Sequence, residues 1–140
     1  MDRDVPENID DIDDIFVGQL MSTGLYSVSP DTLVEDAAQT LLDNHIGSLV
    51  VLDDSDRLLG ILTSTDFVTI VAESEPKAKT TVDRYMTDEV ITVSADDPIR
   101  DAADTLITYD IHHLPVVDDA NRAIGMLSTT DLTAYVSDVR

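Results

Sequence analysis

Apolar residues in this chain fall into short continuous runs and into helical spacings. The runs at residues 49–52 and 58–62 suit buried strands, and the turn-rich residues 53–57 between them predict a hairpin. The runs at 114–117 and 123–127, joined by residues 118–122, predict a second hairpin. Residues 25–28 and 90–93 are β-prone and predict one further short strand ahead of each hairpin.

A helix is predicted between each short strand and its hairpin. Apolar residues recur there at helical spacing, at Leu33, Ala37, Ala38, Leu41 and Leu42 and again at Ala102, Ala103, Leu106 and Ile107. Thr32 and Glu35 fit a capping box at the first helix start. At the second start, Asp97 is the expected cap and Pro98 the expected first helical residue. Further helices are expected from about Thr63 and Ser128, which gives the order β-α-β-β-α twice.

This order is repeated because the sequence itself is repeated. Residues 21–67 align with residues 86–132 at an offset of 65 without a gap, and 19 of the 47 positions are identical. Two copies favour a pseudo-symmetric pair over an open solenoid, and a half of roughly 60 residues is marginal alone, so the copies should share a core. The expected organisation is an acidic leader at 1–17, repeats at 18–72 and 82–140, and a linker at 73–81. Ile9, Ile12, Ile15 and Phe16 could form a short amphipathic helix in the leader.

Charge is the second prominent property of the chain. The 140 residues carry 29 acidic and 8 basic side chains, for a net charge of −21. Such a charge repels a phosphate backbone, so a nucleic-acid partner is not expected. It also destabilises the compact state unless salt screens it. The composition resembles that of cytosolic proteins from salt-in halophilic archaea, with an ordinary acidic protein as the alternative. Without cysteine, a signal-peptide core or a membrane-length apolar run, we expect a soluble cytoplasmic protein.

One motif at the end of each hairpin carries candidate chemistry. Residues 60–66 read Gly-Ile-Leu-Thr-Ser-Thr-Asp, and residues 125–131 read Gly-Met-Leu-Ser-Thr-Thr-Asp. Hydroxyl groups and free N–H groups at a helix start can hold a phosphate, and a carboxylate one turn later can accept from ribose hydroxyls. The alternative is purely structural, because Thr63 with Asp66 and Ser128 with Asp131 also fit capping boxes.

These motifs, taken in order, resemble the cystathionine-β-synthase (CBS) family. The first set is Met21-Ser22-Thr23, residues 49–53 and residues 60–66; the second is Met86-Thr87-Asp88, residues 113–118 and residues 125–131. Together they resemble a CBS pair, or Bateman module, over residues 17–137. The resemblance implies a mixed α/β (α+β) fold of two β-α-β-β-α repeats, related by a pseudo-twofold axis with packed sheets. It also implies two clefts that bind adenosine-containing ligands such as AMP, ADP, ATP or S-adenosylmethionine.

The resemblance further implies that each cleft draws on both repeats. One cleft would comprise Ser128, Thr130 and Asp131 for ribose and phosphate, Leu25, Tyr26 and Ile46 around the base, and His112 and His113 near the phosphates. The other would comprise Thr63, Thr65 and Asp66, with Val90, Ile91 and Ile111 around the base. We expect the first to be the better phosphate site, because the other repeat has Gly47-Ser48 in place of the histidines.

Several of these residues have plainer interpretations. Tyr26 could stack on adenine or simply lie at the edge of the core. His112 and His113 could be residues at the start of a strand with no ligand. A metal site with Asp110 is not expected, because adjacent histidines seldom point at one ion, and no catalytic motif or cofactor site is recognisable.

The resulting hypothesis is a non-catalytic sensor that binds an adenosine compound and signals to a partner protein. The net charge favours AMP, an uncharged or cationic adenosyl compound, or a nucleotide with Mg²⁺ or K⁺ over free ATP. The alternative is an interaction or dimerisation scaffold with empty clefts. The resemblance also implies a homodimer of CBS pairs, with the apolar faces of the last helices as one candidate contact. The ligand, the number of occupied clefts, the dimer geometry and the effector protein stay open.

Overall fold

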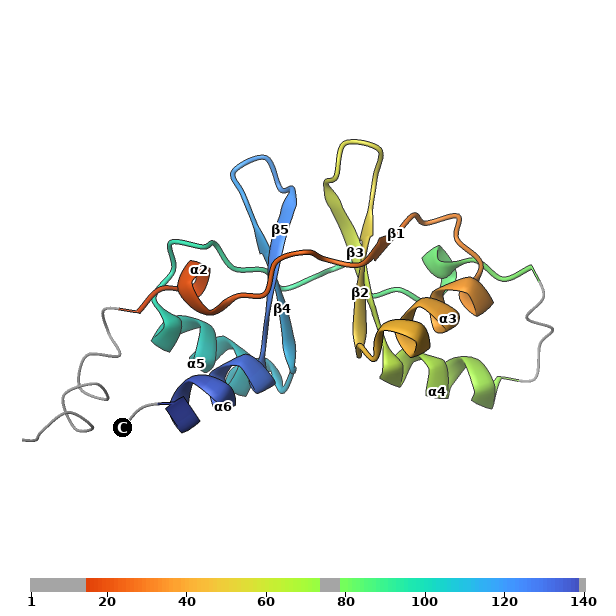
Figure 1. Cartoon of the computed structure of the whole chain (residues 1–140). Coiled ribbons are helices and arrows are strands. Elements are labelled where there is room, and N and C mark those ends of the chain that lie inside the picture. Colours follow the sequence, from red (N-terminus) through yellow and green to blue (C-terminus); the bar gives the residue numbers. More distant parts are fainter. Residues whose placement is uncertain (1–14, 74–78, 139–140) are drawn as a thin grey trace, which may run out of the picture. The chain divides into compact units, whose positions relative to one another are not determined.

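A computed structural model describes residues 15–73 and 79–138. Their elements run α2 (Val17–Leu20), β1 (Ser27–Val28), α3 (Val34–Asn44), β2 (Ser48–Leu52), β3 (Leu58–Thr63), α4 (Ser64–Ala72), the 3-10 helix η2 (Val82–Arg84), α5 (Ile99–Tyr109), β4 (His113–Val117), β5 (Ala123–Ser128) and α6 (Thr129–Asp138) (Figure 1). Both hairpins and all four main helices are therefore confirmed. Ile9 and Ile12 of the expected leader helix lie outside the described residues, whereas Ile15 and Phe16 are described and lie before the start of α2, with Phe16 in a bridge to Pro98.

The chain forms two compact units whose boundaries differ from those of the repeats. The α4 unit comprises Leu25–Val90 and Ala120–Ala123, and the α6 unit comprises Met1–Gly24, Ile91–Asp119 and Ile124–Arg140. The chain therefore passes from one unit to the other after Gly24 and again after Val90, and residues 120–123 of the second hairpin turn are grouped with the α4 unit. As a result, the segment that precedes each repeat in sequence packs in the unit that holds the other repeat.

The α4 unit has a three-stranded sheet in the order β1-β2-β3. Strand β1 pairs in parallel with β2, and β2 pairs antiparallel with β3, so that Val50 lies between Ser27 and Ile61. Helices α3 and α4 lie on the same side of this sheet (Figure 1). The buried core consists of Ala37, Leu41, Leu49, Val51, Leu62 and Val82.

The α6 unit repeats this arrangement with a shorter first strand. Strands β4 and β5 form a two-stranded sheet, and a single parallel bridge from Val93 to Val116 replaces the pairing of β1. Helices α5 and α6 again lie on one side of the strands (Figure 1). Its core consists of Val17, Val93, Ile99, Ala102, Leu106, Leu114, Val116 and Leu127. The sequence order β-α-β-β-α is confirmed in the first repeat, and in the second repeat the strand expected at residues 90–93 is reduced to the single bridge at Val93. The packing of one sheet on the other stays a prediction.

The starts of α3 and α5 correct the predicted caps. Leu33 and Pro98 are the N-cap residues, without side-chain cap bonds, so the Thr32–Glu35 capping box and the Asp97 cap are wrong. The hydroxyl of Thr32 accepts the N–H of Ser29 instead, and the carboxylate of Asp97 accepts that of Ser94. The reason is that two incoming segments, residues 15–24 and residues 80–90, supply backbone carbonyls that accept hydrogen bonds from these helix starts.

These incoming segments make matching hydrogen bonds in the two units. In the α6 unit, Ile99 N–H donates to Ile15 O at 2.8 Å and Val17 N–H donates to Asp97 O at 2.9 Å. In the α4 unit, Val34 N–H donates to Thr80 O at 3.0 Å and Val82 N–H donates to Thr32 O at 2.8 Å. The structural repeat thus begins at residues 15 and 80, six residues before the repeat that is visible in the sequence.

A second contact attaches the same segments to the hairpins. Ser22 and Met126 exchange backbone hydrogen bonds of 2.8 and 2.9 Å, and Thr87 and Ile61 exchange bonds of 2.9 and 3.0 Å. These bonds bring Ser22 and Thr87 to the strands that lead into α6 and α4. Among the described residues, none of the helices has the length and apolar character needed to cross a bilayer.

Candidate ligand-binding site

Both hydroxyl-x-x-Asp motifs lie where a strand passes directly into a helix. In the α6 unit, Ser128 N–H donates to Asp131 Oδ2 at 2.9 Å, and Asp131 N–H donates to Ser128 Oγ at 3.2 Å. In the α4 unit, Thr63 N–H donates to Asp66 Oδ2 at 2.7 Å, and the pair forms a reciprocal capping box. The structural interpretation of these motifs is therefore confirmed.

The capping role leaves part of each carboxylate available. In both units the cap bonds go to Oδ2, and an ionised carboxylate has about four acceptor positions. Asp66 and Asp131 are half-buried, while Thr65 and Thr130, in the first turns of α4 and α6, are exposed. Each motif thus presents a fixed carboxylate and an exposed hydroxyl at a helix N-terminus, where the helix dipole favours anionic groups of a ligand.

The two histidines lie beside the Asp131 motif. The carbonyl of His112 accepts the N–H of Thr129 at 3.0 Å, and His113 begins strand β4. Burial lowers the pKa of His113 below its ordinary value of 6.5, the neighbouring His112 lowers this pKa further, and Asp131 opposes the shift. His113 is therefore a neutral hydrogen-bonding group near pH 7 rather than a cation.

The equivalent place in the α4 unit has no imidazole. There the carbonyl of Gly47 accepts the N–H of Ser64 at 3.0 Å, as that of His112 does from Thr129. The two motifs therefore have matching backbones and different side chains. Within the described residues, no cluster of three or more His, Cys, Asp or Glu could hold a metal ion.

The residues predicted to frame the base are divided between the two units. Leu25, Tyr26, Ile46 and Val90 belong to the α4 unit, and Ile91 and Ile111 belong to the α6 unit. The side chain of Tyr26 is 47% exposed, which fits both a position at the edge of the core and a ring that is available for stacking. Within the α6 unit the structure groups Ser128, Asp131, His112 and His113, and within the α4 unit it groups Thr63, Thr65 and Asp66. The combination of residues from both units in one cleft stays a prediction.

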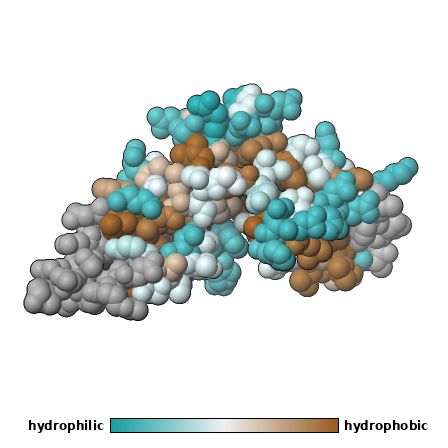
Figure 2. Space-filling view, viewed as in Figure 1, coloured by the Kyte–Doolittle hydropathy of each residue, from teal (hydrophilic) through white to brown (hydrophobic). Residues whose placement is uncertain are grey.

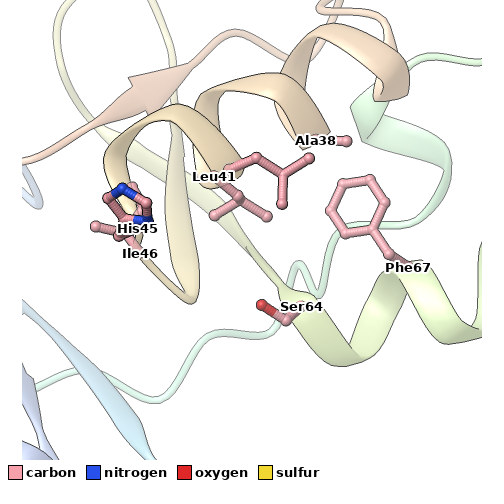
Figure 3. A pocket seen from close by; sticks show the side chains of 7 residues that line it. Ala38, Leu41, His45, Ile46, Ser64 and Phe67 are labelled. Atoms are coloured by element: carbon pink, nitrogen blue, oxygen red, sulfur yellow. The ribbon is translucent and has the colours of Figure 1, made fainter.

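Ile46 also borders a cavity that sequence reasoning did not predict. The cavity measures about 380 Å³ and lies between α3 and α4, where Leu41, Ile46 and Phe67 supply apolar walls and His45 and Ser64 are polar (Figure 3). A cavity of about 370 Å³ lies between α5 and α6, lined by Ala103, Leu132 and Tyr135 among others. Both lie on the helical side of their unit, and the first reaches the hydroxyl-x-x-Asp motif of its unit at Ser64.

Sequence reasoning also missed a role for Ser22. Its hydroxyl lies 3.4 Å from Asp131 Oδ1, the oxygen that the cap does not use. A signal was present, because a hydroxyl residue follows methionine in both motifs, as Ser22 and as Thr87. That signal contributed to the family resemblance but was given no chemistry.

Comparison with known proteins places the chain in a family. The CBS domain model matches residues 17–73 and again residues 82–138. The chain belongs to the CBS domain family and has two copies of the domain. Because the matches cover both hydroxyl-x-x-Asp motifs, the family resemblance of the sequence is confirmed.

Several relatives resemble this chain along most of its length. An uncharacterised 17.7 kDa protein of Acidianus ambivalens is 33% identical over 123 residues, which cover 88% of this chain and 74% of that protein. A homoserine O-acetyltransferase of Methanosalsum zhilinae is 33% identical over 129 residues, or 92% of this chain, but only 25% of the enzyme is covered. The match to that enzyme therefore concerns only a part of it.

Solved structures share the fold. The CBS domain pair of protein MJ0100, in complex with 5′-methylthioadenosine and S-adenosyl-L-methionine, has a TM-score of 0.82 at 28% identity and covers 89% of this chain and 98% of its own. CBSX2 in complex with AMP has a TM-score of 0.80 at 26% identity and covers 90% and 99%. These two relatives bind adenosine compounds.

Proposed function

We propose that this chain is a non-catalytic regulatory module that binds an adenosine-containing ligand at its hydroxyl-x-x-Asp motifs. The observation that carries the proposal is how the two carboxylate oxygens of Asp131 are used: the helix cap holds Oδ2, whereas the one hydrogen bond to Oδ1 from the described residues is the long contact of Ser22. A carboxylate held in this way is suited to accept hydrogen bonds from ribose hydroxyls. Known ligands of the related CBS pairs support the adenosine class.

The Asp131 motif is proposed as the better of the two sites. Beside it, His112 and His113 add two imidazole groups, where the α4 unit has Gly47 and the smaller hydroxyl side chain of Ser48. Ser128 and Thr130 are proposed to supply the hydroxyl groups that contact the ribose and phosphate of the ligand. Leu25, Tyr26 and Ile46 are proposed to frame the base at this site, and Val90, Ile91 and Ile111 at the Asp66 site.

Electrostatics favours ligands with little negative charge. The chain carries a net charge of −21, and the neutral state of His113 near pH 7 provides no compensating cation. We therefore infer that adenosine, AMP, a cationic adenosyl compound such as S-adenosylmethionine, or a nucleotide with Mg²⁺ or K⁺ binds more tightly than metal-free ATP. The inferred output is a surface change that an effector protein detects in the cytoplasm.

The test of this function is thermal unfolding with adenosine, AMP, ADP, ATP and S-adenosylmethionine in molar KCl. Ligand at 100 times its dissociation constant should stabilise the protein by about 2.7 kcal/mol. Asp66→Ala and Asp131→Ala form a matched pair, since each removes a helix cap along with a candidate ligand group. Compared with its own ligand-free protein, Asp131→Ala should lose most of the shift. A shift that survives both substitutions would overturn the site, and turnover of any nucleotide would overturn the non-catalytic assignment.

We also propose that two copies associate through their helical sides. Large apolar residues are exposed there in both units, namely Leu42, Val68, Val71, Ile107, Tyr109 and Val136. Figure 2 shows an apolar area over α4 next to strongly hydrophilic surface. Twofold pairing of such a face would cover the cavity of the unit that supplies it, because a self-complementary interface uses the same patch on each subunit.

Light scattering in molar KCl tests this association. Val71→Asp together with Val136→Asp should convert a dimer to a monomer, and Ser55→Asp in the hairpin turn is the control that should stay dimeric. A monomeric wild-type protein would overturn the dimer. A dimer without any adenosine binding would instead favour the scaffold alternative.

A further inference from the structure

We propose that Ser22 is a positioning residue for Asp131 and makes ligand affinity at this site depend on a vicinal diol. The proposal rests on the proposed function, because it concerns how the Asp131 site distinguishes its ligands. Ser22 lies 109 residues from Asp131 in the sequence, and its hydroxyl donates to Asp131 Oδ1 at 3.4 Å.

The backbone of Ser22 is held firmly next to Asp131. Its N–H donates to Met126 O at 2.8 Å, and its carbonyl accepts the N–H of Met126 at 2.9 Å. Met126 is buried in β5, the strand that leads directly into the motif of Ser128 and Asp131. The Ser22 side chain itself is exposed. The backbone of Ser22 is therefore held in place, and its hydroxyl lies on a side of Asp131 that solvent or a ligand can reach.

Each carboxylate oxygen of Asp131 accepts one hydrogen bond from a backbone or hydroxyl group of the described residues. Ser128 N–H occupies one position on Oδ2, and the Ser22 hydroxyl occupies one position on Oδ1. Since each carboxylate oxygen has about two acceptor positions, one remains on each oxygen. Two neighbouring hydroxyl groups of a ligand can each donate to one of them. Ser128 therefore holds Oδ2 and Ser22 restrains Oδ1, which leaves one acceptor position on each oxygen for the two hydroxyl groups of a cis-diol.

The length of the Ser22 contact suits this role. Hydroxyl–carboxylate bonds are usually 2.5–3.0 Å long, so a contact of 3.4 Å is weak and can shorten or turn when a ligand hydroxyl arrives. Without Ser22, rotation of the Asp131 carboxylate would be limited by the helix cap at Oδ2 and no longer by a contact at Oδ1. A ligand without the diol does not use Oδ1, so its affinity should not depend on Ser22.

Calorimetry with adenosine and 2′,3′-dideoxyadenosine in molar KCl tests the proposal. Ser22→Ala should weaken adenosine binding about fivefold, the effect of losing one weak hydrogen bond to a charged group, and leave dideoxyadenosine binding unchanged. Ser22→Thr should restore adenosine binding, because it keeps the hydroxyl. Ser137→Ala is the matched control: it removes an exposed hydroxyl from the same unit, where Ser137 donates to Ala134 O, and should change neither affinity.

The outcomes separate this proposal from the proposed function. If Ser22→Ala weakens both ligands equally, or neither, the positioning role is wrong while the ligand site stands. If the wild-type protein binds adenosine no more tightly than dideoxyadenosine, Asp131 does not bind the ribose hydroxyl groups, and the positioning role is also wrong. If the wild-type protein binds no adenosine compound at all, the proposed function is overturned and the role of Ser22 with it.

Discussion

Gly125 lies directly beneath the thioether of Met21: a Cβ atom added to Gly125 would be 2.5 Å from Met21 Sδ and 3.1 Å from the carbonyl oxygen of Ser22. Gly60 has the same relation to Met86, with distances of 2.7 Å to its Sδ and 2.8 Å to the carbonyl oxygen of Thr87. These glycines are therefore needed for space, because each lets an incoming segment pair with a strand at close range.

Alanine at either glycine should destabilise the protein. We expect a cost of about 1–3 kcal/mol, as is typical of overpacking. The cost should be greater for Gly60→Ala, because the backbone oxygen of Thr87 is closer and moves less easily than a methionine side chain. Chemical denaturation measures both. Gly24→Asn is a useful comparison, since Gly24 has φ +70° and nothing within 4 Å of its added Cβ, and asparagine tolerates that backbone conformation. Equal costs for all three variants would contradict this account.

The incoming segments should also be required for the core of each unit. Val17 and Val82 are both fully buried, although neither lies in a main helix or strand of its unit. Val17→Ala and Val82→Ala should each cost about 2 kcal/mol. Val71→Ala, at a position that is 82% exposed, should cost little when measured on protein of the same oligomeric state.

Truncation gives a stricter form of this prediction. A fragment of residues 82–138 contains a complete family match but lacks residues 15–24, so it should not fold alone. Addition of residues 15–24 through a flexible linker should restore cooperative unfolding. A stable fragment of residues 82–138 would show that the incoming segment is dispensable.

How well the sequence predicted this fold depended on the type of contact. The hairpins, the four helices and the motifs at Thr63 and Ser128 were predictable because they follow from local periodicity and local capping. The caps at Thr32 and Asp97 were mispredicted because distant carbonyls of Thr80 and Ile15 satisfy those helix starts. The contact of Ser22 with Asp131 was not predictable for the same reason, since it spans 109 residues and depends on where the chain changes units.

Acid should destabilise the protein through His113. Burial lowers the pKa of His113 in the folded state below 6.5, so the unfolded chain binds more protons as the pH falls below 6.5. The free energy of unfolding should therefore decrease with falling pH in this window and rise again with increasing pH. His113→Asn should reduce this loss, whereas His45→Asn, at an exposed position of the α4 unit, should not. Thermal unfolding between about pH 7 and pH 5 is the measurement, and identical profiles for wild type and His113→Asn would refute the assignment.

Salt should stabilise the fold strongly. A net charge of −21 on 140 residues produces self-repulsion, which a Debye length of about 3 Å at 1 M salt largely removes. The melting temperature should rise between about 0.1 M and 1 M KCl. A variant with Asp88→Asn, Asp104→Asn and Asp119→Asn, three exposed positions, should show a smaller rise. No salt dependence in the wild type would argue against adaptation to high salt.

If Asp131 anchors an adenosine ligand, its removal should abolish binding in isothermal titration calorimetry in molar KCl. Wild-type protein titrated with adenosine, AMP and metal-free ATP should give saturable binding, with adenosine or AMP tighter than metal-free ATP, and Asp131→Ala should lose that binding while Asp66→Ala keeps it. The absence of saturable binding in the wild type, or the same binding in Asp131→Ala, would contradict the claim.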